Sequence, residues 1–457
     1  MFRQVILSLA LVIVAGCASN SEVDYANEAT KKSERYLTEL LDAKGIQPST
    51  AQQPNNTSLL TDLVDVPELK PYLDSALANN PSLQQSIIAL QIAYAEHGVT
   101  SADQLPSVSA GFSGEVSDEN EDVYQADVTV TWELDLWQKL ADSSAAAAKD
   151  IASSEAELQA TKDLLAANII RAWLEISVNK QLLSIEQQRL DILENNEVLV
   201  LERYQVGLGS LEELDSAKTS TASTRATVAE YQETVAQSER SLILLTGQWG
   251  AETNTPQVAL EFPEVLSPLD SLSEQTLAGR PDLQQAFFNI EAEAFRTDAA
   301  YKAMLPSFSL TASLTDLAES PSEALFSDPL WSILGSISAP LFQGGMLKSQ
   351  AELAELTTEQ AYWTYQETLL SAVNEVENTV GQESALEQQQ THLVEALASS
   401  QRSIVSYEEK YRQGLVDILD LLTVQQQSYD IQAQLASTTY QRLLNRVDLG
   451  LALGLGI

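Results

Sequence analysis

The chain has few of the residues from which most enzyme and metal sites are built. Its 457 residues include one cysteine, two histidines and three methionines. His97 and His392 lie far from each other and from Cys17 in the sequence, so neither a thiol–imidazole pair nor a histidine–cysteine metal site can be assembled. We therefore expect no resident metal and no cofactor.

Long apolar runs and positive charge are also scarce. No stretch of about 18 apolar residues, the least that a membrane-spanning helix needs, occurs. Lysine and arginine total 25 against 65 acids, a formal charge of −40. This charge excludes nucleic acid as a partner, because phosphate contacts require clustered lysine and arginine. The acids could instead attract cations into a conduit that they line, or keep the protein soluble in a saline habitat. A hydrolase with paired carboxylates is the enzyme that such a composition could suggest. Among so many acids, however, coincidental pairs are inevitable, and no apolar pocket that would raise the pKa of one carboxyl group is apparent, so we expect no enzyme.

The first residues have the features of a secretory leader peptide. Arg3 is followed by an apolar run at 5–14 that is too short to span a bilayer. The run ends in VAGC at 14–17, which resembles the lipobox of bacterial lipoproteins. That resemblance implies cleavage before Cys17, a diacylglycerol on its sulfur and an acyl group on its new amino terminus. In the lipoprotein-sorting rule an aspartate next to the cysteine retains the protein at the inner membrane, so Ala18 at this position favours the outer membrane. The alternative for Cys17 is a buried free thiol.

An internal repeat organises the rest of the chain. The segment PSLQQ at 81–85 recurs 200 positions later as PDLQQ at 281–285, and LPS at 105–107 recurs at 305–307. The chain therefore consists of two copies of one unit. Each copy has a helical lead-in, two alternating segments and two very long helices.

Each copy ends in a predicted helical hairpin. Residues 138–206 contain neither glycine nor proline, and good helix formers dominate them. Apolar residues recur at three and four positions, which predicts packing stripes along a helix of about 100 Å. Gly207 suits the left-handed end of that helix, and a second helical run extends to about Thr246. The second copy repeats this arrangement over 346–449, with Gly414 at its turn.

Two pairs of alternating segments precede the hairpins. Apolar residues alternate with small polar ones over 107–116, 124–134, 307–315 and 331–341. This pattern matches transmembrane β-strands around a wet lumen, although a water-soluble sandwich also shows it. Four strands cannot close a barrel, and open edges are not tolerated in lipid. Eight strands from two copies would be filled by side chains, whereas twelve from three copies leave a wider lumen, so we expect a trimer.

Several short motifs, weak singly but specific in this order, resemble those of the outer membrane factor family, the TolC-like outer membrane efflux proteins. The closest resemblance is to the lipoprotein branch that serves RND-type efflux systems. The motifs are LANNP at 77–81, WELDLW at 132–137, LLTG at 244–247, GRPDL at 279–283, APLFQGG at 339–345, and the paired YxxGL turns at 204–208 and 411–415.

The resemblance implies a mixed α and β membrane protein in the outer membrane. Its homotrimer would join a 12-stranded transmembrane β-barrel to a 12-helix periplasmic α-barrel. An inner-membrane RND or ABC-type pump would deliver drugs or other small molecules to it through a periplasmic adaptor (membrane fusion) protein. The expected parts are a lipoprotein signal peptide, a lipidated segment, a first repeat, a linker and a second repeat, at residues 1–16, 17–66, 67–247, 248–268 and 269–457.

The resemblance also implies a gate at the hairpin tips, near 207 and 414. Family members carry acids there that project into the closed end, and a tyrosine and an arginine that hold it shut. Glu213 and Asp420 match the acids and Tyr411 the tyrosine. Val416 stands where some members carry the arginine, so Asp417 and Arg412 are candidate substitutes. The expected adaptor contacts are the turn residues Gly207, Leu208, Gly414 and Leu415.

Three other interpretations stay open. The tip acids are alternatively solvated surface residues of a very acidic protein. The same fold also serves type I protein secretion, and long helices alone also suit a structural coiled-coil lipoprotein without a pore. The alternating strands weigh against this last alternative, because a coiled coil needs none.

Overall fold

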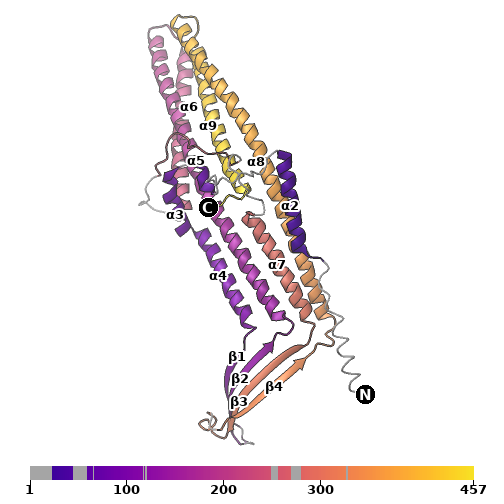
Figure 1. Ribbon diagram of the computed structural model, residues 1–457. Helices are drawn as coiled ribbons and strands as arrows, with labels where there is room; N and C mark the ends of the chain where they lie inside the picture. Colours follow the sequence, from indigo (N-terminus) through magenta and orange to yellow (C-terminus); the bar gives the residue numbers. More distant parts are fainter. Residues whose placement is uncertain are drawn as a thin grey trace. The chain divides into compact units, whose positions relative to one another are not determined.

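The computed structural model describes residues 23–44, 59–64, 66–116, 118, 121–248, 256–268, 279–325 and 328–457 (Figure 1). Cys17 and the leader peptide lie outside the described residues. The chain divides into two compact units. Unit 1 comprises Met1–Tyr36, Ser86–Leu158 and Pro281–Leu369, and unit 2 comprises Leu37–Gln85, Gln159–Arg280 and Leu370–Ile457. Each unit draws on both sequence repeats, so the compact units do not follow the order of the chain.

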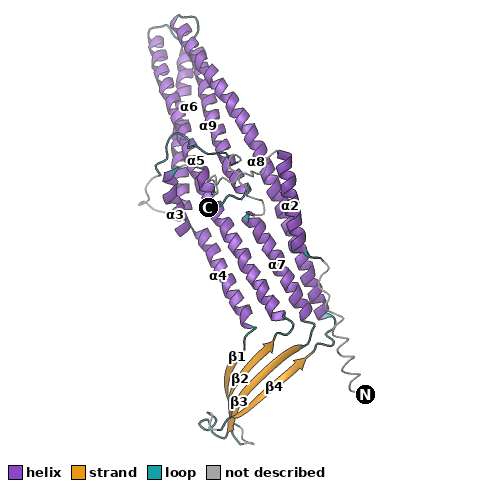
Figure 2. Ribbon diagram, in the orientation of Figure 1, coloured by secondary structure: helices purple, strands orange, loops and turns teal. Residues whose placement is uncertain are grey.

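Helices make up most of the described chain (Figure 2). They are α2 (Tyr25–Lys44), α3 (Lys70–Asn79), α4 (Pro81–Ala102), α5 (Lys139–Gln205), α6 (Leu211–Leu245), α7 (Pro281–Lys302), α8 (Met346–Arg412) and α9 (Ile418–Ala452). Two short 3₁₀ helices, Leu60–Leu63 and Pro67–Leu69, precede α3. Within the described ranges, no helix is both long and apolar enough to cross a membrane.

The two repeats match each other closely in length. Helices α5 and α8 both have 67 residues, and α6 and α9 both have 35. Helices α4 and α7 both have 22 residues and begin at a proline, whose missing N–H costs nothing at the first helical position. Each repeat supplies two strands and two long helices, which confirms the mixed α and β class.

Unit 1 contains one antiparallel sheet in the order β1-β2-β3-β4. Its strands are β1 (Ser107–Glu115), β2 (Val123–Leu134), β3 (Ser307–Ala318) and β4 (Leu330–Ser338). The sheet joins the repeats, because β2 of the first pairs with β3 of the second along eleven residue pairs, from Tyr124↔Ala318 to Leu134↔Phe308. β4 ends before Pro340, which cannot donate a ladder hydrogen bond, so Leu341 lies in the connection to α8.

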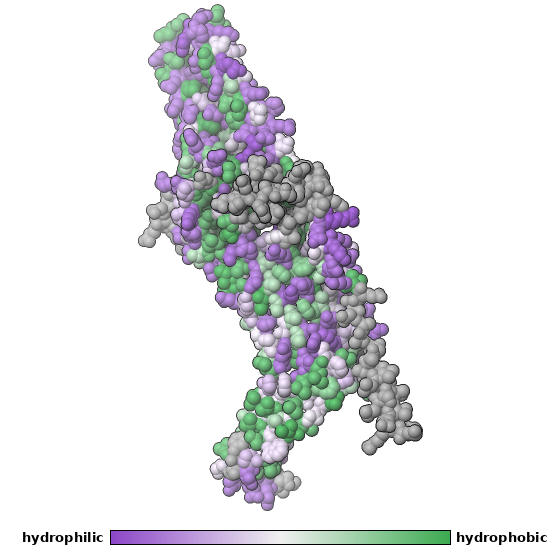
Figure 3. All heavy atoms as spheres, in the orientation of Figure 1, coloured by the Kyte–Doolittle hydropathy of each residue, from purple (hydrophilic) through white to green (hydrophobic). Residues whose placement is uncertain are grey.

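The register gives the sheet one apolar and one polar face. Aligned rows such as Val108–Val130–Ala312–Ile333 form the apolar face, and rows such as Ser109–Thr129–Ser313–Ser332 form the polar face. Apolar side chains gather over the strands on the face seen in Figure 3. The exceptions are Asp316 on the apolar face, and Val123, Leu317, Leu330 and Leu334 on the polar face.

Polar contacts join helices α5 and α7 of unit 1. Lys302 pairs with Asp142, Arg296 pairs with Asp150, and Lys149 Nζ lies 2.9 Å from Glu291 Oε2. Further along, the Ser153 hydroxyl donates to Asn289 Oδ1 at 2.8 Å. The Arg296 and Lys149 pairs are partly exposed and contribute little each, whereas Asp142 and Ser153 are buried, so their partners satisfy polar groups that water cannot reach.

Three of the motifs that resemble the efflux family, LANNP, LLTG and GRPDL, have their contacts in unit 2. Asn80 Nδ2 donates to the Leu245 carbonyl at 2.9 Å, and Asn80 Oδ1 accepts from the N–H groups of Ser82 and Leu83, which caps α4. The LANNP and LLTG motifs thus form a single helix junction. In the GRPDL motif, Arg280 is 8% exposed and donates to the Ala452 carbonyl at 3.1 Å.

Candidate gate at the hairpin tips

Both hairpin turns of unit 2 have the same backbone hydrogen bonds. The Leu208 N–H donates to the Arg203 carbonyl at 2.8 Å, and the Gly207 N–H donates to the Tyr204 carbonyl at 3.0 Å. In the second turn, Leu415 and Gly414 donate to Lys410 and Tyr411 at 2.9 and 3.0 Å. This is the Schellman arrangement, and it requires the left-handed backbone that the two glycines adopt, at φ +77° and +71°.

The acids after each turn cap the helices that follow. Glu213 Oε2 accepts from the Ser210 N–H at 3.0 Å, while the Ser210 hydroxyl accepts from the Glu213 N–H at 3.1 Å. This is a capping box at the start of α6. At the start of α9, Asp420 Oδ2 accepts from the Asp417 N–H at 3.3 Å. The acids expected at a gate therefore have a local structural role as well.

Tyr411 joins the two hairpins through a residue that the sequence did not indicate. Arg203 Nη1, near the end of α5, donates to the Tyr411 hydroxyl at 3.4 Å, and Nη2 donates to the Leu208 carbonyl at 3.4 Å. The pKa of Arg203 is raised, first by the hydrogen bond to Tyr411 and also by the carboxylates of Glu213 and Asp417. The Arg203 guanidinium thus interacts with residues of both hairpin tips.

Arg412 takes no part in this group. Its Nη1 lies 3.7 Å from Glu409 Oε2 on the same helix, and both side chains are exposed. One signal in the sequence could have identified Arg203. It directly precedes the first YxxGL turn, and the corresponding residue of the second turn is also basic. Lys410 is the counterpart of Arg203, and its Nζ lies over the Tyr407 ring instead.

An apolar cluster holds the two hairpins together beside the turns. Its members come from α5, α6 and α9, with Tyr411 of α8 packed against them, and are Leu193, Val200, Leu214, Ala217, Ile418, Leu421 and Leu422. The turns themselves leave apolar side chains exposed, notably Val206, Leu208 and Leu415 at 69–72%. The tip therefore combines a closed apolar seam with an apolar surface open to a partner.

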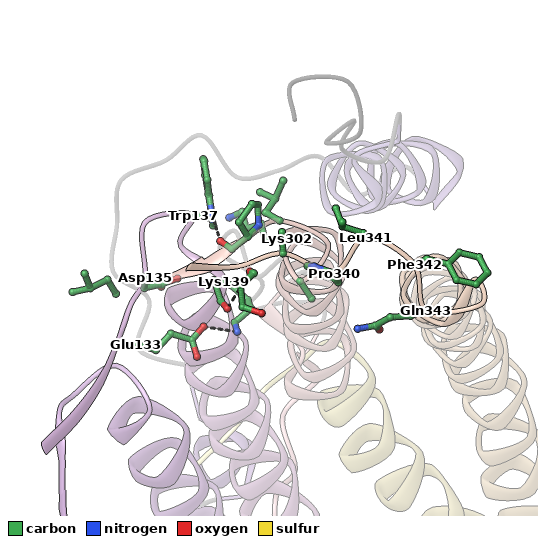
Figure 4. A pocket seen from close by; sticks show the side chains of 16 residues that line it. Glu133, Asp135, Trp137, Lys139, Lys302, Pro340, Leu341, Phe342 and Gln343 are labelled. Atoms are coloured by element: carbon green, nitrogen blue, oxygen red, sulfur yellow. Dashed lines mark hydrogen bonds and ion pairs between the residues drawn. The ribbon is translucent and has the colours of Figure 1, made fainter. Parts of the chain in front are cut away.

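A second distinctive region lies in unit 1, where the strands meet the helices. A pocket of about 700 Å³ is lined by residues of the WELDLW and APLFQGG motifs (Figure 4). Trp137 Nε1 donates to the Pro306 carbonyl at 2.7 Å, and Lys139 pairs with Glu133 at 2.7 Å. Leu341 and Phe342, which belong to the lining of the pocket, are 94% and 89% exposed.

Comparison with known proteins identifies the class to which this architecture belongs. The model of the outer membrane efflux protein family matches residues 72–248 and 272–455, and the chain belongs to this family. It is an outer-membrane exit duct of an efflux system, as the sequence predicts.

Named relatives match over most of their length. The chain is 26% identical to the probable outer membrane lipoprotein SilC of Salmonella typhimurium, over 100% of this chain and 99% of the relative. It is 25% identical to the cation efflux system protein CusC of Escherichia coli K12, over 85% and 87%. The crystal structure of the Campylobacter jejuni CmeC outer membrane channel shares the fold, with a TM-score of 0.81, 21% identity, and 91% and 92% coverage.

Proposed function

We propose that the protein acts as a homotrimeric, gated duct that conducts small molecules or ions passively and carries out no chemistry. The observation that carries the proposal is the sheet of unit 1. Its outer strands, β1 and β4, each pair on one side only within the described residues, and its two faces differ in polarity. Three such sheets, joined edge to edge, would make a closed barrel of twelve strands with an apolar outside.

Backbone energetics explain why closure is needed. Each unpaired backbone group costs several kcal/mol in hydrocarbon, and each outer strand here has nine residues. A single sheet is therefore unstable in a bilayer, and pairing β1 of one copy with β4 of the next removes both edges. The exposed Leu341 and Phe342 lie just after β4, where a neighbouring copy or lipid would cover them.

The partners of the duct follow from its place in an efflux system. We propose that a periplasmic adaptor contacts the exposed tip leucines, Leu208 and Leu415, and that an inner-membrane pump supplies the energy. The relatives are named for different cargo, such as cations for CusC and toluene for TtgC of Pseudomonas putida. This variety on one fold supports cargo selection by the pump, and it favours small-molecule efflux over protein secretion.

Mass measurement and conductance test the duct directly. We expect the detergent-extracted full chain to have three times the protomer mass and to form ion-conducting channels in planar lipid bilayers. A trimer that does not conduct, either as wild type or with the tip substitution Arg203→Ala, would favour the structural coiled-coil lipoprotein. A monomer would contradict the closed barrel.

Cys17 is proposed as the lipid-anchoring residue. We expect Cys17→Ser to abolish incorporation of radiolabelled fatty acid, because serine lacks the sulfur that would carry the diacylglycerol. Three acyl chains on one cysteine would give stable anchoring, where one is marginal. Cys17 is the only cysteine, so no other thiol can take the label. Labelling that persists in Cys17→Ser would refute the assignment.

A further inference from the structure

We propose that Asp127, on β2, sets the charge preference of the strand-lined part of the conduit. The inference rests on the proposed function, because three copies must close the sheet before its polar face becomes an aqueous wall. It concerns a different part of the chain from the hairpin tips, and a different property from opening and closing.

The register places Asp127 in the interior of the polar face. It lies opposite Gly111 on β1 and Thr315 on β3. The next row of the same face, towards the helices, consists of serines and a threonine: Ser109, Thr129, Ser313 and Ser332. In a closed barrel the apolar face meets lipid and the polar face lines water. The Asp127 carboxylate therefore stands in the wall of the conduit, with the small residues Gly111 and Thr315 on either side of it, and it is partly exposed.

Gly111 is what leaves room for this carboxylate. A Cβ at position 111 would lie 2.7 Å from Asp127 Oδ1, closer than real Cβ contacts allow. The carboxylate thus occupies the space over the glycine. Its hydrogen-bond partner among the described residues is the Thr129 hydroxyl, 3.4 Å from Oδ2, which is a long contact. Oδ1 is left to water or to a passing cation.

No cation of the sheet neutralises Asp127. The four strands contain no lysine, arginine or histidine. Their other acids differ in setting: Glu133 is paired with Lys139 at 2.7 Å, Asp316 lies on the apolar face and is 6% exposed, and Glu115 ends β1. Asp127 is the acid in the interior of the polar face that has no ion pair within the described part of the chain.

Three copies of this carboxylate would act on ions in transit. Fixed charges of one sign in a confined aqueous path raise the local concentration of counter-ions and exclude co-ions. The favoured cargo at this level is therefore cationic, whether an inorganic cation or a protonated amine, and passage of anions is reduced. Glu133 adds less, because Lys139 compensates it.

Reversal potentials under a KCl gradient test the inference. Wild type and Asp127→Asn are recorded in planar bilayers, each also in the Arg203→Ala background, so that the recordings do not depend on a closed tip. We expect Asp127→Asn, which keeps the size of the side chain, to lower the cation-to-anion permeability ratio by about threefold. The matched control is Glu121→Gln, which removes the same charge from the exposed β1–β2 connection and should leave the ratio unchanged.

The outcomes separate the inference from the proposed function. A conducting Asp127→Asn channel with the wild-type ratio overturns the inference and leaves the duct standing. An equal fall in Glu121→Gln also overturns it, because overall charge would then be the cause. If neither the wild-type trimer nor the Arg203→Ala trimer conducts, the proposed function and the inference both fail.

Discussion

Arg203→Ala is expected to raise the resting ion flux through the trimer by about tenfold or more. The guanidinium joins the two hairpin tips of each protomer through the Tyr411 hydroxyl, while its bond to the Leu208 carbonyl stays within the first turn. Hydrogen bonds of this long, partly exposed kind contribute about 0.5–1 kcal/mol each. Acting in three copies they would shift the resting equilibrium by about 1.5–3 kcal/mol, and 1.4 kcal/mol is a tenfold change. Single-channel recording in planar bilayers measures the change.

Two further variants show which contact matters. Tyr411→Phe removes only the hydroxyl that accepts from Arg203, and we expect it to reproduce most of the effect. Arg412→Ala removes an arginine from the same tip whose ion pair stays on its own helix, and should behave as wild type. If Arg412→Ala opens the channel as much as Arg203→Ala, the link assigned to Arg203 is wrong.

The tip acids call for amide variants rather than alanine. Glu213→Gln and Asp420→Asn keep an oxygen that can accept the capping hydrogen bond, while they remove the charge. Reduced block by divalent cations in these variants would assign the acids to the gate. Unchanged block would leave them with their capping role alone.

Gly247→Ala is expected to destabilise unit 2 by about 3 kcal/mol or more. Gly247 has φ +72°, and a Cβ there would lie 2.3 Å from the Asn79 carbonyl oxygen. Left-handed backbone costs an L-residue about 1–2 kcal/mol, and the overlap with a rigid carbonyl adds the rest. Thermal unfolding followed by circular dichroism should show a melting temperature lower by about 6 °C or more.

Gly207→Ala is the matched control for this prediction. Gly207 has the same left-handed backbone, at φ +77°, but no atom lies within 4 Å of where its Cβ would be. Its substitution should therefore cost only the backbone penalty, about 1–2 kcal/mol. Equal losses in the two variants would show that the close approach to Asn79 does not determine the stability of the α3–α6 junction.

The strands and the glycine turns could be predicted from the sequence because each depends on residues close together in the chain, and the repeats could be predicted because short motifs recur in the same order. The strands follow from alternation with a period of two, and the two turns from one glycine each. The capping box of Ser210 and Glu213 is equally local, since a serine three residues before a glutamate is its signature, whereas the family resemblance points only to a gating role for Glu213.

Other features depend on residues far apart in the sequence, and only the tertiary structure decided them. Arg203 of α5 became the partner of Tyr411 of α8 because Tyr411 packs against the apolar cluster that α5 shares with α6 and α9. Asp127 was one strand acid among several until the register placed it over Gly111, in the interior of the polar face. The sequence by itself therefore determined which elements form and which faces are apolar, since these follow from local periodicity. Packing between distant segments decided which polar groups meet, because such contacts leave no periodic pattern in the chain.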